Sequence, residues 1–263
     1  MNQNTHFFSW DARRDIAHPG DFDETLSFCA EHFVSCAKEA IKMHGFFTVA
    51  LSGGSTPKAL YAKVSHPPYS SEIDWSKCFL FWSDERSVPP TDQASNFWMA
   101  LEAGFKSVSI PIEQVCRMEA EADIAEHADA YEQKIKSILG QRPFDLLMLG
   151  VGTDGHTASL FPKTPALKET EKWVVANPLP KGKGKRMTLT YPCINRSSNI
   201  VIYALGQGKQ EIVKKVFLDS EGAAFPVSKV GSPTNKALWI VDSEAGKALF
   251  DHLPAEHTPS KTG

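Results

Sequence analysis

The chain has 263 residues, of which 42% are hydrophobic and 22% charged, and its formal net charge at pH 7 is −3. This balance is ordinary for a globular protein with a sizeable core, and the slightly acidic charge argues against a nucleic-acid scaffold. No run of about 18 apolar residues occurs, so we predict no membrane-spanning segment.

The first predicted element is a helix from residue 22, which follows a short irregular N-terminus. Its apolar side chains recur at helical spacing, and Gly45 follows as a stop signal. A buried strand is predicted over residues 46–51 and ends at a Gly-Gly turn. Thr56 and Pro57 then indicate the start of a helix, as a hydroxyl cap followed by proline at the first helical position.

The rest of the chain alternates strands with helices. Strands are predicted over residues 77–82, 144–150, 173–176, 186–190, 199–206 and 237–242, and helices over 121–140 and 208–217. Apolar strands separated by helices favour an α/β fold with a mostly parallel sheet covered on both faces. We expect one domain over residues 1–263 with its core at about 22–252, a mobile basic loop at 178–186 and a frayed C-terminal tail.

The Gly-Gly turn has two interpretations. Unpaired amides at a helix N-terminus carry partial positive charge, and glycines let a phosphate approach them closely. The alternative is a tight strand-to-helix turn that needs glycine for its backbone alone.

Ligands of open α/β sheets bind beyond the carboxyl ends of the strands, where three further features lie. The cluster Asp84-Glu85-Arg86 follows one strand, and by itself is typical of a solvated loop. His156 follows another strand between glycine-permitted turns, which favours a functional histidine. Lys209 begins a helix after a third strand, where an exposed surface lysine is the alternative.

The segments ALSGGSTPKALY, FWSDERSVPPTDQASN, FDLLMLGVGTDGHTASLFP and RMTLT resemble successive motifs of the 6-phosphogluconolactonases, in order between about residues 46 and 242. The resemblance implies a Rossmann-like fold and hydrolysis of 6-phospho-D-glucono-1,5-lactone to 6-phosphogluconate, the second step of the oxidative pentose phosphate pathway. It implies no nucleotide, metal or other cofactor. A more distant similarity is to glucosamine-6-phosphate deaminases, whose motif typically reads GHIAFNEP where this chain has GHTASLFP.

Lactone hydrolysis requires a base that takes a proton from water and donors that stabilise the oxyanion. A neutral His156 is the expected base, since histidine titrates near neutral pH. Asp84 and Asp154 are the carboxylates expected to orient the histidine, the water or substrate hydroxyls, with their individual roles open. Serine hydrolase chemistry is disfavoured because no GxSxG elbow exists and Ser159 lies within TASLF.

The substrate phosphate is expected at the Gly-Gly turn. The predicted ligands are Gly53, Gly54, Ser55 and Thr56, with positive charge from Arg186 and Lys209. Arg86 has three open roles, which are to bind phosphate, to polarise the lactone carbonyl or to hold its own loop.

Five widely spaced cysteines without a CxxC pair are typical of reduced core thiols and favour a cytoplasmic location. We expect a small-molecule substrate, no nucleic-acid or membrane partner, and either a monomer or a small homo-oligomer. A non-catalytic sugar-phosphate sensor is a further alternative, but it would need a DNA-binding module, and the residues before the first predicted strand are expected to form only one long helix.

Overall fold

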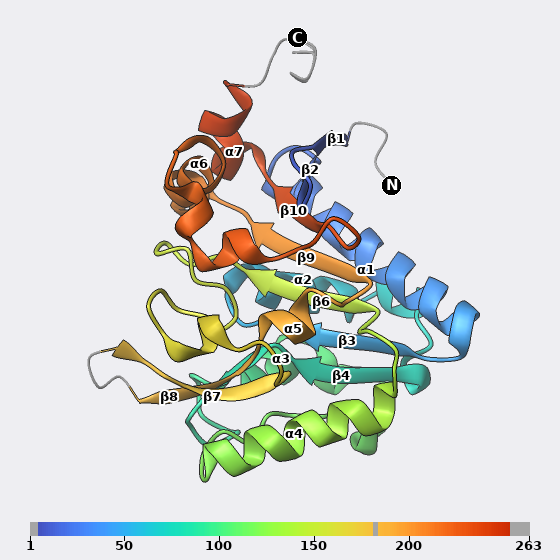
Figure 1. Ribbon diagram of the computed structural model, residues 1–263. Coiled ribbons are helices and arrows are strands. Elements are labelled where there is room, and N and C mark those ends of the chain that lie inside the picture. Colours follow the sequence, from blue (N-terminus) through green and yellow to red (C-terminus); the bar gives the residue numbers. More distant parts are fainter. Residues whose placement is uncertain (1–4, 181–183, 253–263) are drawn as a thin grey trace.

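The computed structural model describes residues 5–180 and 184–252. Its centre is a seven-stranded sheet in the order β1-β2-β10-β9-β6-β3-β4 (Figure 1). The strands are β1 (His6–Ser9), β2 (Arg14–His18), β3 (Phe47–Leu51), β4 (Cys78–Trp82), β6 (Leu146–Gly150), β9 (Asn199–Ala204) and β10 (Ala237–Val241). Every neighbouring pair in this sheet is parallel except β1 with β2. The prediction of a mostly parallel sheet is confirmed.

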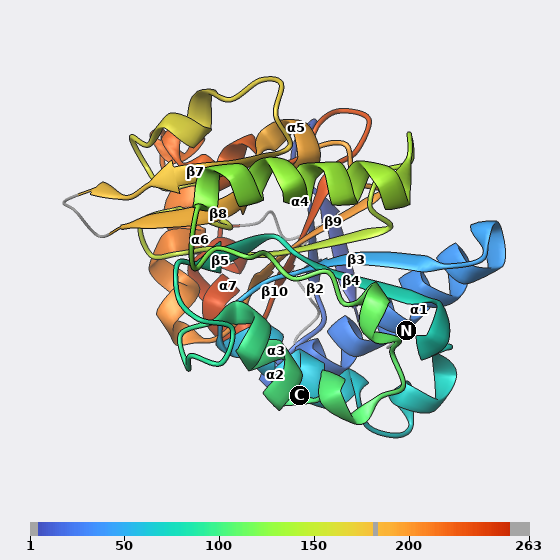
Figure 2. The same cartoon turned by 90° about the horizontal axis from the view of Figure 1, so that it is seen from below.

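Helices cover both faces of this sheet, as predicted (Figure 2). They are α1 (Phe22–His44), α2 (Ser55–Val64), α3 (Asn96–Ala103), α4 (Ile124–Leu139), α5 (Tyr191–Ile194), α6 (Gln210–Leu218) and α7 (Ser243–Phe250). Figure 2 shows α1, α2 and α3 on one side and α4 on the other. Helix α1 begins at a capping box of Asp21 and Glu24 and ends at the predicted Gly45, whose φ of 94° suits glycine.

A second, three-stranded antiparallel sheet has the order β5-β8-β7, with β5 at Asp84–Arg86, β7 at Val174–Pro178 and β8 at Lys185–Leu189. The last two were predicted as strands, but they pair with each other and do not extend the parallel sheet. The predicted basic loop at 178–186 is wrong at both ends, since residue 178 belongs to β7 and residues 185 and 186 belong to β8. Its residues 181–183 lie outside the described residues.

One residue, Ser83, joins the two sheets. It lies between the last residue of β4 and the first residue of β5. Its backbone N–H and its Oγ both donate to the carbonyl oxygen of Leu51 in β3, at 2.7 and 3.0 Å. Its own carbonyl accepts from the N–H of Leu189 in β8, at 2.9 Å. The buried serine therefore connects the end of the large sheet to the start of the small one.

The prediction of an irregular N-terminus is wrong, because residues 6–9 and 14–18 form β1 and β2. Strand β2 pairs in parallel with β10, which lies more than 200 residues later. Only Ile16 and Ala17 give β2 an apolar pattern, and two residues are too few to indicate a strand. The long-range pairing with β10 decides the structure here, so the sheet begins well before residue 22.

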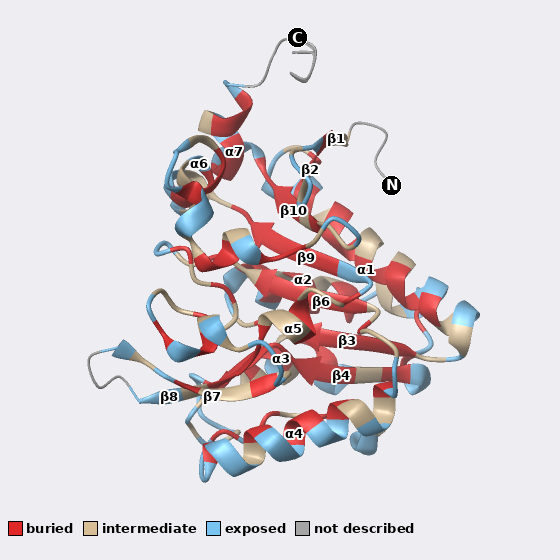
Figure 3. Cartoon of the chain, in the orientation of Figure 1, coloured by how far each residue is buried: buried red, intermediate tan, exposed pale blue. Residues whose placement is uncertain are grey.

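The core lies between the large sheet and its helices (Figure 3). Every residue of β3 is buried, as is every residue of β9 after Asn199. Burial on both faces explains why these strands are continuously apolar. The predicted C-terminal tail falls on residues 253–263, outside the described residues.

Candidate active site

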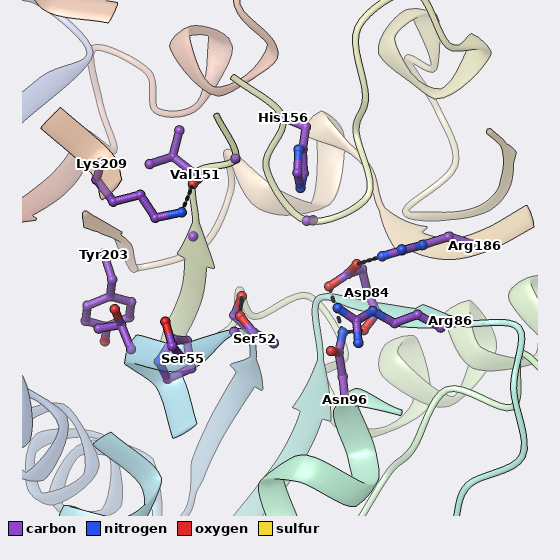
Figure 4. A pocket seen from close by; sticks show the side chains of 17 residues that line it. Ser52, Ser55, Asp84, Arg86, Asn96, Val151, His156, Arg186, Tyr203 and Lys209 are labelled. Carbon is purple, nitrogen blue, oxygen red and sulfur yellow. Dashed lines mark hydrogen bonds and ion pairs between the residues drawn. The ribbon is translucent and has the colours of Figure 1, made fainter. Parts of the chain in front are cut away.

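The predicted site residues meet in one pocket at the carboxyl ends of β3, β4, β6 and β9 (Figure 4). The cavity has a volume of about 200 Å³. The predicted residues that line it are Gly53, Gly54, Ser55, Thr56, Asp84, Arg86, His156, Arg186 and Lys209. Asp154 is not part of the lining but contacts His156 from behind. Loops after four parallel strands thus converge as expected for an open α/β sheet.

The N-terminus of α2 opens into this pocket. The helix begins at Ser55, two residues before the predicted first helical position at Pro57, and its cap is Gly54, which makes no side-chain hydrogen bond. The predicted hydroxyl cap by Thr56 is therefore wrong. Gly54 has φ 114° and ψ 171°, a conformation open to glycine alone. The amides of Ser55 and Thr56 donate to no acceptor in the described part of the chain, so they remain available to an anion.

Gly53 is required by its neighbour Asn96. A Cβ at residue 53 would lie 2.0 Å from the side-chain oxygen of Asn96, so either the turn or the Asn96 side chain would have to shift. Asn96 in turn donates from Nδ2 to the Asp84 carbonyl at 2.8 Å and to the Asp84 carboxylate at 3.1 Å. This buried asparagine links the Gly-Gly turn to β5. It was not predicted as a site residue, although it ends the quoted segment that contains Asp84.

Asp84 is a buried carboxylate with three polar neighbours. Besides Asn96, the hydroxyl of Ser159 donates to its Oδ2 at 2.5 Å, and an Nη of Arg186 lies 4.0 Å from the same oxygen. Ser159 is thus a donor that orients Asp84, consistent with its rejection as a nucleophile. The structure records no contact between Asp84 and His156.

The solvated-loop interpretation of Asp84-Glu85-Arg86 is wrong, since these residues form β5 and both carboxylates are buried. Glu85 accepts hydrogen bonds from the Asn96 and Phe97 amides and from the Ser95 hydroxyl, at 2.8 to 2.9 Å. It therefore caps the N-terminus of α3 and fixes the position of Asn96. Burial raises the pKa of Glu85, although these amide and hydroxyl donors act in the opposite direction.

Arg86 and Arg186 form a cross-strand pair of cations on β5 and β8. Arg86 donates from Nη1 to the carbonyl of Ala94, and its buried Nε has no partner among the described residues. Burial lowers the pKa of Arg186, Asp84 raises it, and the charge of Arg86 lowers it further. An anion between the two arginines would relieve this repulsion. Figure 4 shows both on the side of the pocket opposite Lys209 and Ser55.

His156 points into the pocket with one ring nitrogen held from behind (Figure 4). Its Nδ1 lies 2.5 Å from Oδ1 of Asp154, and its backbone N–H donates to the same oxygen at 3.1 Å. Burial acts to raise the pKa of Asp154, but the hydrogen bond and charge of His156 outweigh it, so that pKa is lowered. An ionised Asp154 favours the proton on Nδ1, which leaves Nε2 as the acceptor.

Gly152 makes room for this arrangement. A Cβ at residue 152 would lie 2.1 Å from Nδ1 of His156 and 2.8 Å from Oδ1 of Asp154. The amide of Gly152 also donates to the His156 carbonyl at 2.8 Å, which closes the loop on itself. The glycine in GTDGH is therefore needed for close approach of the ring.

Lys209 approaches the pocket from the turn after β9. Its Nζ donates to the carbonyl of Val151 at 2.7 Å, and burial lowers its pKa. It is half-buried, so the surface-lysine interpretation is wrong. The turn is held by buried Asp242, whose carboxylate accepts from the amides of Gly206 and Ala245, both at 2.8 Å. Asp242 was also missed, because it acts through the backbone of a distant turn.

The chain is similar to known proteins over most of its length. The family model described as glucosamine-6-phosphate isomerases/6-phosphogluconolactonase matches residues 20–239. A 6-phosphogluconolactonase of Chlamydia pneumoniae is 38% identical over 231 residues, covering 87% of this chain and 88% of the relative. The solved 6-phosphogluconolactonase from Trypanosoma cruzi is 27% identical with a TM-score of 0.80, covering 93% of this chain and 99% of that one. A solved monomeric glucosamine-6-phosphate deaminase, 20% identical, shares the fold at a TM-score of 0.73, covering 88% of this chain and 98% of that one.

Proposed function

The chain belongs to the family of glucosamine-6-phosphate isomerases and 6-phosphogluconolactonases, and we infer from this membership that it hydrolyses 6-phospho-D-glucono-1,5-lactone to 6-phospho-D-gluconate in the oxidative pentose phosphate pathway. The observation that carries the mechanism is the pair formed by His156 and Asp154. It leaves one imidazole nitrogen facing a pocket that has cationic groups on two opposite sides.

In the proposed first step, Nε2 of His156 takes a proton from water, and the water oxygen attacks the lactone carbonyl carbon. The electron pair of the C=O bond moves to the oxygen, which becomes an oxyanion. The Nδ1–H of His156 donates a hydrogen bond to Asp154, whose charge stabilises the imidazolium that forms. In the second step the carbonyl re-forms, the ring C–O bond breaks, and the imidazolium protonates the departing hydroxyl oxygen.

We assign the two ends of the pocket to the two anionic groups of the reaction. The amides of Ser55 and Thr56 and the ammonium of Lys209 are proposed to bind the phosphate dianion. Arg186 lies across the pocket from Lys209, so we revise its predicted role and assign it to the lactone end with Arg86, where guanidinium groups would stabilise the oxyanion. Asp84 then acts by orienting Arg186.

The activity is tested with lactone generated in place by glucose-6-phosphate dehydrogenase. Release of 6-phosphogluconate is followed with and without the protein, because the lactone also opens spontaneously in water. We expect a rate well above the blank that is lost in His156→Asn. A wild-type rate equal to the blank would refute the lactonase function.

The deaminase alternative is tested with glucosamine 6-phosphate as substrate. The likeness to the solved deaminase shows the fold alone, and residues 155–162 read GHTASLFP. We expect no release of ammonia. Ammonia formed as fast as the lactone is hydrolysed would reverse the assignment.

We further propose that the protein acts in the cytoplasm. All five cysteines lie in the described residues, and each is free and buried. Free thiols are the usual state in a reducing compartment.

None of the helices in the described part of the chain has the length and apolarity to cross a bilayer.

A further inference from the structure

The ring of Phe161 contacts two groups of the proposed active site. Its centroid lies 4.1 Å from that of the His156 ring, with an angle of 23° between the planes, so the rings are stacked. The guanidinium carbon of Arg186 lies 5.7 Å from the same Phe161 centroid. Phe161 is not part of the pocket lining and is only half-buried. Its position is therefore not explained by filling the core or by touching a ligand.

The contacts of His156 constrain the imidazole in different directions. Asp154 holds the Nδ1 edge of the ring at 2.5 Å. Gly152 leaves just enough space beside that edge. Both contacts act at one edge of the imidazole, whereas the stacked ring of Phe161 contacts its face and so restrains the tilt of its plane. Without Phe161, one face of the imidazole would lose its contact, and Nε2 would be free to tilt away from the water that it activates.

Arg186 also contacts Phe161. Its guanidinium is 4.0 Å from the Asp84 carboxylate, which is longer than a good ionic hydrogen bond. The face of Phe161 offers a second attraction through its ring electrons, and Arg186 is repelled by neighbouring Arg86. One aromatic ring therefore fixes both the proposed base and a proposed oxyanion donor.

We propose that Phe161 is a positioning residue that sets the plane of the His156 ring and the place of the Arg186 guanidinium relative to each other. The proposal rests on the proposed function for its kinetic consequence. Small misplacements of reacting groups cost much rate, so the ring contributes to kcat without touching the substrate. Binding of the phosphate at the opposite end of the pocket does not depend on it.

The test compares Phe161→Leu and Phe161→Met, which remove the ring, with Phe161→Tyr, which keeps it. The matched control is Phe225→Leu, because Phe225 packs against Gly155 of the same loop, and no ring contact to His156 is recorded for it. We expect kcat to fall about ten- to a hundredfold in the two variants without the ring. KM for the phosphorylated lactone should change little, and Phe161→Tyr and the control should stay near wild type.

A spectroscopic measurement checks the contact without activity. The ring-proton resonances of His156, identified by their loss in His156→Asn, should carry an upfield ring-current shift in wild type and Phe161→Tyr. This shift should be absent in Phe161→Leu and Phe161→Met. Folding of each variant is monitored by thermal unfolding.

Three outcomes would overturn the proposal. These are a kcat in folded Phe161→Met equal to that of the control, a loss of activity in Phe161→Tyr as large as in Phe161→Leu, and a His156 resonance insensitive to the ring. Failure of the lactonase function itself is distinguished by wild-type protein that does not exceed the spontaneous rate. In that case the resonance measurement still decides whether Phe161 stacks on the imidazole of His156.

Discussion

Replacement of Lys209 by methionine is the most direct test of where the substrate phosphate binds. Methionine keeps an apolar stem of similar length, so the half-buried path of the side chain stays filled. Nζ of Lys209 has three donor hydrogens and uses one for the Val151 carbonyl at 2.7 Å. Two donors and the positive charge therefore remain for a phosphate oxygen.

The expected rise in KM for Lys209→Met follows from the donors that the ammonium has left for the phosphate. A hydrogen bond to a charged group contributes about 1.5–3 kcal/mol, which is about a ten- to hundredfold change in affinity at ~1.4 kcal/mol per decade. The lost bond to Val151 is absent from both the free and the bound variant, so it cancels in the comparison. We expect KM for the phosphorylated lactone to rise by that factor. Any fall in kcat should be smaller than the rise in KM.

The assay uses two substrates, 6-phosphogluconolactone and unphosphorylated gluconolactone, with Arg186→Met as the matched variant at the other end of the pocket. Lys209→Met should affect the phosphorylated substrate alone. Arg186→Met should lower kcat on both lactones. The assignment of the two ends is refuted if the results are exchanged, with Arg186→Met raising KM for the phosphorylated lactone alone.

The remaining predictions concern the base, the turn that carries Lys209 and the titration of that lysine. His156→Gln should lower kcat by about a hundredfold or more with little change in KM, since general-base catalysis contributes that much; an unchanged kcat would place the base elsewhere. Asp242→Asn puts an amide donor opposite the N–H of either Gly206 or Ala245, so the free energy of unfolding in urea should fall by about 1–3 kcal/mol; KM for the phosphorylated lactone should rise because the turn that carries Lys209 is held less firmly. Burial lowers the pKa of Lys209, so as pH rises this lysine loses its charge at a lower pH than an exposed lysine does. Calorimetric binding of 6-phosphogluconate should weaken as pH rises through that lowered pKa, and an identical alkaline loss in Lys209→Met would contradict this origin.

Much of the fold could be predicted because its pattern is local. Helix α1 has a capping box, an apolar face and a terminal glycine within 25 consecutive residues, and β3 is continuously apolar. Strands β1 and β2 could not be predicted, since they are short: β2 pairs with β10 from the other end of the chain, and β1 pairs with β2. Strand β5 was missed for a different reason: its sequence is fully charged, and its burial depends on hydrogen bonds to α3.

In the candidate site, too, features with a local sequence pattern could be predicted, and features that depend on distant contacts could not. Glycine turns and charged residues after strands indicated where His156 and the Gly-Gly turn would lie. The roles of the two carboxylates depend on which atoms they reach, and only the structure gives the 2.5 Å contact of Asp154 with His156 and the contact of Asp84 with Ser159. Asn96 was not predicted, because a single asparagine at the start of a helix has no spacing pattern that distinguishes a buried side chain from a solvated one.

Ser83, which joins the two sheets, has a consequence for the size of ligand that fits. The α2 end of the pocket follows β3 of the large sheet, whereas Arg86 and Arg186 belong to the small sheet. Three hydrogen bonds of Ser83, to Leu51 and Leu189, fix the spacing between those sheets. With the phosphate and the lactone at these two ends, as proposed, this fixed spacing would select ligands by their length. We expect a sugar phosphate one carbon shorter to reach the groups at one end only.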